Sequence, residues 1–372
     1  MKILIFNWQD IKNPFGGGAE VHLHEIFKRI ATMGHEITLA CCKFDGSSDE
    51  EMIDGIRVIR KGSRSLFNFY VRGLYKKLSK ENIYDLVIDD INKIPFYTPC
   101  FVKEPLLAIS HHFFGKAIFR EAGFLSGSYV YLAEKLVNKI YRNTPFVVVS
   151  ESTLNEFIER GFEKENFSIV QNAIEQERFP MKICPKFEKP TVVYFGRLKK
   201  YKSVDHLVKA FASIANNVPD ARLEFIGRGD FQPTLERMIA EMGLKERTKF
   251  YGFVSEEEKV EILSKSHIVV NTSIKEGWGI TNIEANACGT PVISADVPGL
   301  RDSVKSGVSG LLYEYGNIKQ LSEKILLLLT NESELNLLSE GAVEWAKTFS
   351  WDNSAELMLK RCKDIIDNNK HT

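Results

Sequence analysis

Short runs of apolar residues recur along the whole chain, and each is followed by turn residues and then by an amphipathic stretch. This alternation is typical of strands and helices that form parallel sheets, so the pattern predicts an α/β fold. In the first half we expect strands at residues 2–6, 36–41, 56–60, 86–89, 106–110, 146–149 and 168–171. In the second half we expect them at 192–195, 223–226, 249–251, 268–271, 291–294 and 310–313.

The segment PMKICPKFEKP, residues 180–190, interrupts this pattern, because its three prolines can neither continue a helix nor donate to a sheet. We therefore predict two doubly wound domains, residues 1–180 and 181–349. Residues 350–372 carry apolar side chains at helical spacing and predict one amphipathic helix.

Composition narrows the function. The 49 Lys and Arg residues balance the 49 Asp and Glu residues, which argues against a dedicated nucleic-acid-binding protein. The six cysteines form no C-x-x-C pair, so we expect reduced thiols and no zinc site. The N-terminal apolar run is too short for a signal peptide, and the longest aliphatic run, residues 325–329, is far shorter than the ~20 residues of a membrane span. We therefore expect a cytoplasmic protein.

The most informative stretch is KEGWGITNIEANACGTPVISADVPGLRDSV, residues 275–304. Two glycines precede a predicted helix at 280–288, and a helix N-terminus offers unpaired N–H groups and a partial positive charge to an anion. This turn predicts a phosphate site, to which we assign the backbone of Gly277, Gly279, Ile280 and Thr281.

Two carboxylates bracket the same turn. Glu276 and Glu284 are separated by seven residues, so that one precedes the helix and the other lies on its first turns. A carboxylate accepts hydrogen bonds from vicinal hydroxyls, so this spacing suits a sugar on one side of a diphosphate and a ribose on the other.

With the ACGTPV that follows at residues 287–292, this pattern resembles the retaining glycosyltransferases of family 4, also called glycosyl transferases group 1. The resemblance covers nearly the whole chain. It implies the GT-B fold, in which two Rossmann-like domains face each other across a cleft and the C-terminal helix packs back on the N-terminal domain. It also implies a nucleoside diphosphate sugar as donor, with Glu276 contacting the sugar as a catalytic residue and Glu284 binding the ribose.

Two further segments extend the resemblance. YFGRLKKYK, residues 194–202, assigns Arg197 and Lys202 to the diphosphate, whose charge an Arg fork and a Lys ammonium can neutralise. Alone, Lys199, Lys200 and Lys202 would also fit a solvated basic loop. The glycines at 16–18 would alone suit any nucleotide-binding domain. The resemblance assigns Gly17 and Gly18 to backbone contacts beside the donor phosphates.

His111 and His112 follow a predicted buried strand, at the edge where α/β sheets bind ligands. The resemblance places a catalytic histidine here, near the donor sugar and the acceptor, whereas a histidine at a strand end is otherwise commonly a packed polar residue. Of the two, we expect His111 to be the histidine that points into the site.

The chain departs from the family in IVQNAIEQERF, where Ala173 and Glu175 replace the usual Gly and Asp, so we interpret that segment as hinge support. No Asp-x-Asp metal motif lies in a loop after a strand; Asp89 and Asp90 are merely adjacent. We therefore expect neither metal nor cofactor. By resemblance we expect retention of anomeric configuration through front-face displacement.

The acceptor is indicated only by class, as a glycan or a lipid-linked hydroxyl. Residues 57–80 carry eight basic residues, no acid and interleaved apolar side chains. This pattern fits a basic amphipathic helix on anionic lipid at the inner face of the membrane, and equally a domain helix with a solvated basic face. Residues 111–132 add a second apolar and aromatic candidate.

We thus predict a GT-B enzyme that transfers a sugar from a nucleoside diphosphate sugar to a hydroxyl. The alternatives are a nucleotide-sugar epimerase on the same fold and a catalytically silent nucleotide-sugar-binding protein. The presence of both Glu276 and Glu284 disfavours the silent protein.

Overall fold

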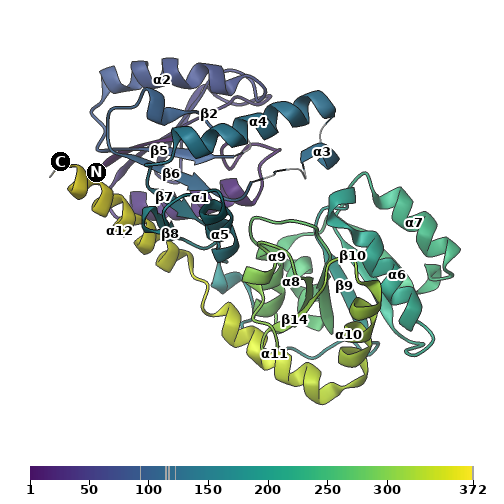
Figure 1. Cartoon of the computed structure of the whole chain (residues 1–372). Helices are drawn as coiled ribbons and strands as arrows, with labels where there is room; N and C mark the ends of the chain where they lie inside the picture. The colour runs from purple at the N-terminus through teal and green to yellow at the C-terminus, as the bar shows by residue number, and fades with distance from the viewer. Residues whose placement is uncertain (93, 114, 116–117, 122, 371–372) are drawn as a thin grey trace. The chain divides into compact units, whose positions relative to one another are not determined.

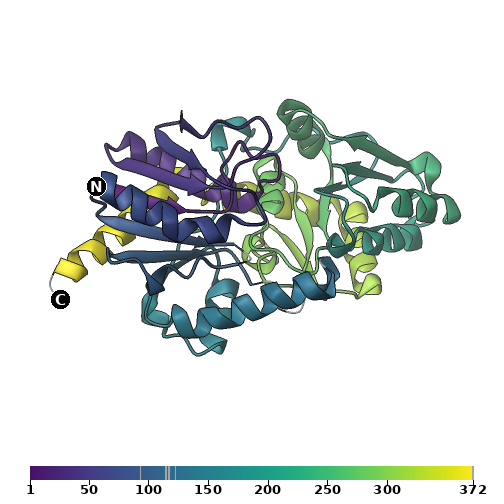
Figure 2. The same cartoon turned by 90° about the horizontal axis from the view of Figure 1, so that it is seen from above.

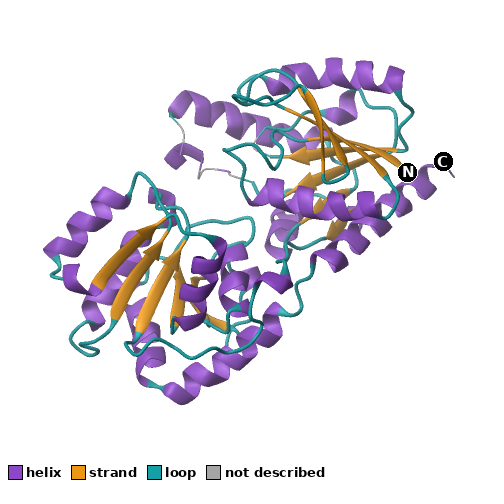
Figure 3. Cartoon of the chain, turned by 180° about the vertical axis from the view of Figure 1, so that it is seen from behind, coloured by secondary structure: helices purple, strands orange, loops and turns teal. Residues whose placement is uncertain are grey.

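The computed structural model describes residues 1–92, 94–113, 115, 118–121 and 123–370. The chain forms two compact units: unit 1 comprises residues 1–172 together with the segment from 351 onward, and unit 2 comprises residues 173–350. In each unit, helices cover both faces of a largely parallel sheet (Figures 1 and 3), which confirms the predicted α/β class.

The sheet of unit 1 has the strand order β3-β4-β2-β1-β5-β6-β7-β8. Its neighbouring strands are parallel except for β3 with β4. The strands are β1 (Lys2–Phe6), β2 (Glu36–Cys41), β3 (Glu50–Ile53), β4 (Ile56–Arg60), β5 (Leu86–Ile91), β6 (Leu106–Ser110), β7 (Phe146–Val148) and β8 (Phe167–Ile169). The helices are α1 (Gly18–Thr32), α2 (Phe67–Glu81), α3 (Ile118–Glu121), α4 (Phe124–Ile140), α5 (Glu151–Glu159) and α12 (Trp351–Lys370).

The edge strand β3 was not predicted. It pairs antiparallel with β4 through a turn at Asp54 and Gly55, both of which have positive φ, 47° and 82°. An Asp-Gly turn between two strands is a strong hairpin signal, but the glutamates of EEMI mask the short strand that precedes it.

Side chains of β1 alternate between the two faces of the sheet. Leu4 and Phe6 pack with Trp8 and with the buried stripe of α2, which consists of Phe67, Val71, Leu74, Tyr75 and Leu78. Helices α1 and α12 pack against each other, and α12 lies on the side of the sheet opposite α2 (Figure 1). The first strand and helix α12 therefore both belong to unit 1, as the view from above also shows (Figure 2).

Unit 2 has the strand order β11-β10-β9-β12-β13-β14, and its neighbouring strands are all parallel. This is the doubly wound order of nucleotide-binding folds. The strands are β9 (Thr191–Phe195), β10 (Arg222–Ile226), β11 (Thr248–Gly252), β12 (Ile268–Asn271), β13 (Val292–Ala295) and β14 (Gly310–Tyr313). The helices are α6 (Val204–Ile214), α7 (Gln232–Glu241), α8 (Glu256–Lys265), α9 (Ile280–Ala287), α10 (Ile318–Thr330) and α11 (Glu332–Ala346).

The chain enters unit 2 at residue 173 and leaves it after residue 350, whereas the sequence pattern predicts that this domain spans 181–349. Residues ahead of the prolines already belong to unit 2, because Ile174 bridges to Ser350 and Gln176 Nε2 donates to the carbonyls of Lys347 (3.1 Å) and Phe349 (2.8 Å).

The basic segment 57–80 is not one amphipathic helix. Arg57 and Arg60 lie in β4, where Arg57 pairs with Glu50 and the fully buried Arg60 pairs with Asp10 (2.7 Å) and Glu51 (2.6 Å). The buried stripe of α2 lies in the core, so the interpretation that Phe67, Leu74, Tyr75 and Leu78 rest on lipid is wrong. The exposed surface of α2 carries the basic residues Arg72, Lys76, Lys77 and Lys80 and also two aromatic side chains, Phe69 and Tyr70. Among the described residues, no helix has the length and apolar character to cross a membrane.

Within unit 1, helix α12 docks on α1 through polar and aromatic contacts. The buried His22 donates from Nε2 to the carbonyl of Val170 (3.0 Å), and its ring packs edge-on against Trp351 at 6.1 Å. Arg29 Nε donates to Asp352 (2.6 Å). Burial and the nearby charge of His111 lower the pKa of His22 to about 3, so the imidazole is neutral in the folded chain at neutral pH.

We expect Arg60→Ala to lower the free energy of unfolding by about 3–5 kcal/mol, because it leaves the buried Asp10 carboxylate without its cation. Urea denaturation measures this loss. The matched control is Arg72→Ala on the exposed face of α2, which should change the stability by no more than about 0.5 kcal/mol. Equal losses in the two variants would contradict the assignment.

We expect His22→Gln to make the free energy of unfolding depend less steeply on pH in acid. Between pH 6.5 and pH 3 the unfolded chain protonates this histidine and the folded chain does not, so stability falls as the pH falls. The variant should lack this contribution, up to about 1.4 kcal/mol per pH unit. Urea titrations at several pH values within this window measure the slope, and identical slopes for both proteins would refute it.

Candidate active site

The loop after β12 in unit 2 carries the predicted sugar-binding carboxylate. Two hydrogen bonds join this loop to the turn after β9: Thr272 Oγ1 donates to the carbonyl of Lys202 (2.8 Å), and the N–H of Ile274 donates to that of Tyr201 (3.2 Å). Two segments some seventy residues apart in sequence are thereby held side by side.

This arrangement brings two predicted residues into direct contact. Lys202 Nζ donates to Glu276 Oε1, and the two side chains are 15% and 18% exposed. A pair that is mostly desolvated but still reachable can exchange one partner for a ligand. The ammonium can therefore be shared between the carboxylate and an incoming phosphate.

The second predicted carboxylate has its own lysine. Lys259 Nζ of α8 lies 2.8 Å from Glu284 Oε1 and 2.6 Å from Glu256 Oε2, with only 6% of the lysine side chain exposed. Burial raises the pKa of Glu284, and the charge of Lys259 limits that rise. Burial alone would lower the pKa of Lys259, but the two carboxylates raise it. Lys259 was not predicted, since it lies in the charged segment EEEKVEILSK, which has no motif.

Close packing within the protein requires glycine at two positions around the start of α9. Gly279 is the N-cap and supplies no side-chain hydrogen bond, and a Cβ there would lie 2.3 Å from Ser303 Oγ. Behind it, a Cβ on Gly299 (φ +82°) would lie 2.0 Å from the carbonyl of Glu276, next to Gly277. With no side-chain cap, the first N–H groups of α9, at Ile280 and Thr281, can donate to an anion.

Hydrogen bonds among amide and hydroxyl side chains hold the start of α9 in position. Asn271 Nδ2 donates to Thr281 Oγ1 and to Asn282 Oδ1, both at 3.3 Å, and Asn282 Nδ2 donates to Ser294 (3.3 Å) and Ser303 (2.9 Å). No sequence motif singles out these asparagines. Their signal is polar residues in otherwise apolar surroundings at the end of a strand and the start of a helix.

Arg197 is exposed on the loop after β9 and donates to the hydroxyl of Tyr201 (3.1 Å). Within the part of the chain that the structure describes, no carboxylate pairs with it. Because Tyr201 also anchors the loop of Glu276, Arg197 belongs to the same cluster as Lys202. Its charge is therefore available to an anionic ligand.

In unit 1, the predicted glycine turn is already engaged by a carboxylate. Gly17 precedes α1, which begins at Gly18, and its N–H donates to Glu20 Oε2 (2.7 Å). Asn92 Nδ2 lies 3.4 Å from the other oxygen of Glu20. Burial raises the pKa of Glu20. The N–H of Gly17 thus reaches a phosphate only if Glu20 releases it.

His111 follows β6 and is buried beside Asp90, whose Oδ1 lies 3.1 Å from His111 Nε2. The ring of His22 stands edge-on to that of His111 at 5.2 Å. Burial alone would lower the pKa of His111, but the charge and hydrogen bond of Asp90, with the charge of Glu20, raise it. His111 is therefore the histidine whose orientation is fixed by a carboxylate.

His112, the next residue, is half-buried. Asp89, adjacent to Asp90, has a structural role, since its Oδ2 accepts from Tyr141 (2.5 Å) and Thr98 (2.6 Å). Burial raises the pKa of Asp89 to about 6. Over the described ranges, no three or more His, Cys, Asp or Glu side chains cluster as metal ligands.

Both units match models of known protein families. Residues 175–345 match the model for Glycosyl transferases group 1, and residues 16–178 match the model for Glycosyltransferase Family 4. Among curated relatives, the poly(glycerol-phosphate) alpha-glucosyltransferase of Bacillus subtilis is 27% identical over 60% of this chain. The match spans only 33% of that longer protein.

Solved structures show the same fold over the whole chain. A sucrose-phosphate synthase from Thermosynechococcus elongatus has a TM-score of 0.80 at 20% identity, covering 99% of both chains. The Anabaena protein HepE, solved in complex with UDP-glucose, has a TM-score of 0.75 at 19% identity over 98% of this chain and 100% of its own. With the two family matches and the doubly wound order of unit 2, these show that the chain belongs to the group 1, family 4 glycosyltransferases with the GT-B fold.

Proposed function

We propose that this glycosyltransferase takes a sugar from a nucleoside diphosphate sugar and transfers it to a hydroxyl acceptor with retention of anomeric configuration. The observation that carries the proposal is the start of α9, where an uncapped helix N-terminus lies between Glu276 and Glu284, each held by its own lysine. The donor class is supported by the fold shared with HepE, which was solved with UDP-glucose.

In this proposal the diphosphate binds at the N–H groups of Ile280 and Thr281, with Lys202 and Arg197 supplying positive charge. As the bond from the anomeric carbon to the phosphate oxygen breaks, negative charge develops on the leaving diphosphate. Two cations and the helix dipole stabilise that charge, so the proposal needs no metal ion.

The two carboxylates then have separate roles. Glu276, on the loop before α9, contacts the sugar and shares Lys202 with the phosphate. Glu284, on α9, binds the ribose hydroxyls, and Lys259 favours the charged form of its carboxylate and orients it. Lys259 is a positioning residue, since its ammonium is committed to Glu284 and Glu256.

Unit 1 supplies the acceptor side. We assign His111 there in preference to His112, because Asp90 fixes its ring. For retention, the acceptor oxygen attacks the anomeric carbon on the face that the phosphate leaves, and the acceptor proton passes to the departing phosphate oxygen. One C–O bond forms and one breaks, and no covalent enzyme intermediate is required.

We further propose that unit 1 meets its acceptor at an anionic membrane surface, through α4 and not through the apolar stripe of α2. Four apolar side chains on α4 are spaced four, three and four residues apart, which places them on one helix face. They are exposed in the structure: Leu125 84%, Tyr129 51%, Leu132 59% and Leu136 47%.

The surroundings of this α4 stripe are basic. Lys135 and Lys139 are exposed on α4, whereas its one acid, Glu134, is buried and accepts from the N–H of Gly115 (2.9 Å). Asn68 Nδ2 donates to the Tyr129 hydroxyl (3.4 Å), which joins the stripe to the start of α2. Apolar side chains flanked by cations suit insertion among anionic lipid headgroups. Part of the apolar candidate segment 111–132, namely residues 114, 116–117 and 122, lies outside the described residues.

We expect Glu276→Ala to abolish most sugar transfer while binding of the nucleoside diphosphate persists, because this carboxylate contacts the sugar. Glu284→Ala should instead weaken nucleoside diphosphate binding by about 1–3 kcal/mol, the range for a lost charged hydrogen bond. Calorimetry with UDP and with UDP-glucose, alongside transfer assays on membrane lipid extract, measures both effects.

Glu261→Ala, an exposed change on α8, is the matched control and should behave as wild type. Equal losses for both ligands in both variants would refute the division of roles. NMR of the product reads the anomeric configuration, and transfer in EDTA should equal that without it. Interconversion of donor isomers without an acceptor would favour an epimerase, and donor binding without turnover a silent binding protein.

We expect Leu132→Ser and Leu136→Ser each to weaken binding to vesicles of anionic lipid by roughly tenfold, since each removes an apolar contact with the bilayer. Added salt should weaken wild-type binding, and neutral vesicles should bind poorly. Leu337→Ser, at a leucine of α11 that is 61% exposed, is the control. If the wild-type protein does not bind anionic vesicles at low salt, the membrane proposal is refuted, and a soluble saccharide becomes the preferred acceptor.

A further inference from the structure

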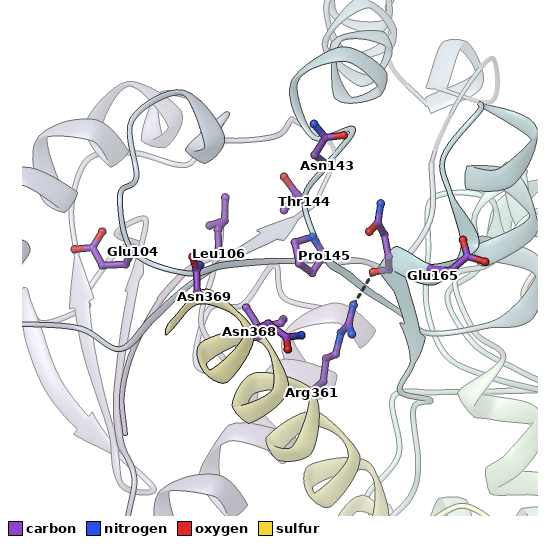
Figure 4. Close-up of a pocket in the computed structure, with 11 residues that line it drawn as sticks. Glu104, Leu106, Asn143, Thr144, Pro145, Glu165, Arg361, Asn368 and Asn369 are labelled. Atoms are coloured by element: carbon purple, nitrogen blue, oxygen red, sulfur yellow. Dashed lines mark hydrogen bonds between the residues drawn. The ribbon is translucent and has the colours of Figure 1, made fainter. Parts of the chain in front are cut away.

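Unit 1 contains a cavity of about 450 Å³ at the edge of its sheet where strands begin (Figure 4). The segments that lead into β6, β7 and β8 and the last turns of α12 line it. On α12, Arg361 donates from Nη2 to the carbonyl of Asn166 (2.8 Å), drawn as a dashed line in Figure 4. This contact ties α12 to the segment before β8, so we interpret the cavity as part of the packing of unit 1 and assign no ligand to it.

In unit 2, the residue after Lys202 has an unusual conformation. Ser203 is buried and lies in the left-handed region, with φ 49° and ψ 39°. This region is unfavourable for a residue with a Cβ. Ser203 is also the N-cap of α6, where a serine hydroxyl commonly accepts from a helix N–H, but within the described chain its hydroxyl caps none of them. Ser203 therefore gives up two ordinary sources of stability at one position.

A tyrosine from another part of the sheet explains this conformation. Ser203 Oγ and Tyr315 Oη lie 2.8 Å apart, and either can donate. Tyr315 follows β14, 112 residues further along the chain, and its ring packs against His206 on the first turn of α6 at 5.3 Å. A strained backbone persists only where its surroundings hold it. The bond to Tyr315 is therefore the side-chain contact that holds Ser203 in place.

The conformation of Ser203 sets the direction of Lys202. The carbonyl of Lys202 accepts from Thr272, at the end of β12 (2.8 Å). Hydrogen bonds from residues that follow β12 and β14 thus fix this turn at two points. From the turn, Lys202 Nζ donates to Glu276. A change in the backbone at Ser203 would move the ammonium away from Glu276.

We propose that Tyr315 is a positioning residue for sugar transfer. Its hydroxyl holds Ser203, and through Ser203 it directs the Lys202 ammonium toward the departing diphosphate. This inference rests on the proposed function, in which Lys202 neutralises the charge that develops on the diphosphate. Because that charge is greatest in the transition state, a displaced ammonium should lower kcat more than it raises KM.

Steady-state kinetics of transfer to membrane lipid extract test this role, with the donor that calorimetry selects among UDP-glucose, UDP-galactose and GDP-mannose. Tyr315→Phe keeps the ring against His206 and removes only the hydroxyl. We expect kcat to fall about tenfold and KM for the donor to change less than about threefold. The matched control is Tyr313→Phe on β14, whose hydroxyl has no hydrogen-bond partner among the described residues. It should keep the wild-type kcat.

Substitutions at Ser203 separate positioning from a general loss of stability. Ser203→Ala loses the same hydrogen bond and keeps the Cβ, so its kcat should match that of Tyr315→Phe. The double variant should be no worse than either, because both residues act through one bond. Glycine adopts the left-handed conformation without a partner, so Ser203→Gly combined with Tyr315→Phe should regain at least about half of the wild-type kcat. Circular dichroism confirms that every variant is folded at the assay temperature.

The inference is overturned if Tyr315→Phe keeps the wild-type kcat, if the losses of the two single variants multiply in the double variant, or if Ser203→Gly fails to restore kcat. Lys202→Ala distinguishes this from a failure of the proposed function. If Lys202→Ala lowers kcat and Tyr315→Phe does not, only the role of Tyr315 is wrong. If Lys202→Ala keeps the wild-type kcat, or if the wild-type protein binds none of the three donors, the proposed function of this site fails and the role of Tyr315 fails with it.

Discussion

The reversal of strand order within each sheet is the constraint on which the chemistry depends. In unit 2, β9 lies between β10 and β12, so the connections after β9 and β12 leave toward opposite faces of the sheet. The loops after β9 and β12 lie at this point, where hydrogen bonds from the Thr272 hydroxyl and the Ile274 N–H hold the turn of Lys202 against the loop of Glu276. In unit 1 the corresponding reversal lies between β1 and β5. Glu20 lies on α1, the helix that follows β1, and Asp90 lies in β5.

Pairing of desolvated charges is the second common feature. Lys202 with Glu276, Lys259 with Glu284 and Arg60 with Asp10 are all largely withdrawn from water. A buried ion pair adds little net stability, but the loss of one partner is costly, so each pair fixes the position of its members. At Arg60 this holds the β3–β4 hairpin; at the two glutamates it presents carboxylates in a defined orientation.

The sequence predicted what depends on local pattern. Parallel strands are short apolar runs, and Glu276, Glu284 and the glycines between them form a compact motif whose chemistry can be interpreted directly. Lys259, Asp90, Glu20 and His22 could not be found in this way, because each acquires its role from a contact distant in the sequence. The same limit explains α2: the sequence shows its apolar residues, but only the fold shows that Phe67, Leu74, Tyr75 and Leu78 face the core and that α4 exposes a stripe of apolar side chains.

The return of the chain to unit 1 has a consequence for synthesis. Helix α12 supplies part of the core of unit 1, where Trp351 meets His22 and Ser354 donates to the carbonyl of Gln171 (2.9 Å). As the chain leaves the ribosome, the face of α1 that α12 covers stays uncovered until residues 351–370 have emerged. Unit 2 is continuous in sequence and has all its residues first, so the order in which the units are completed is the reverse of the order in which they begin.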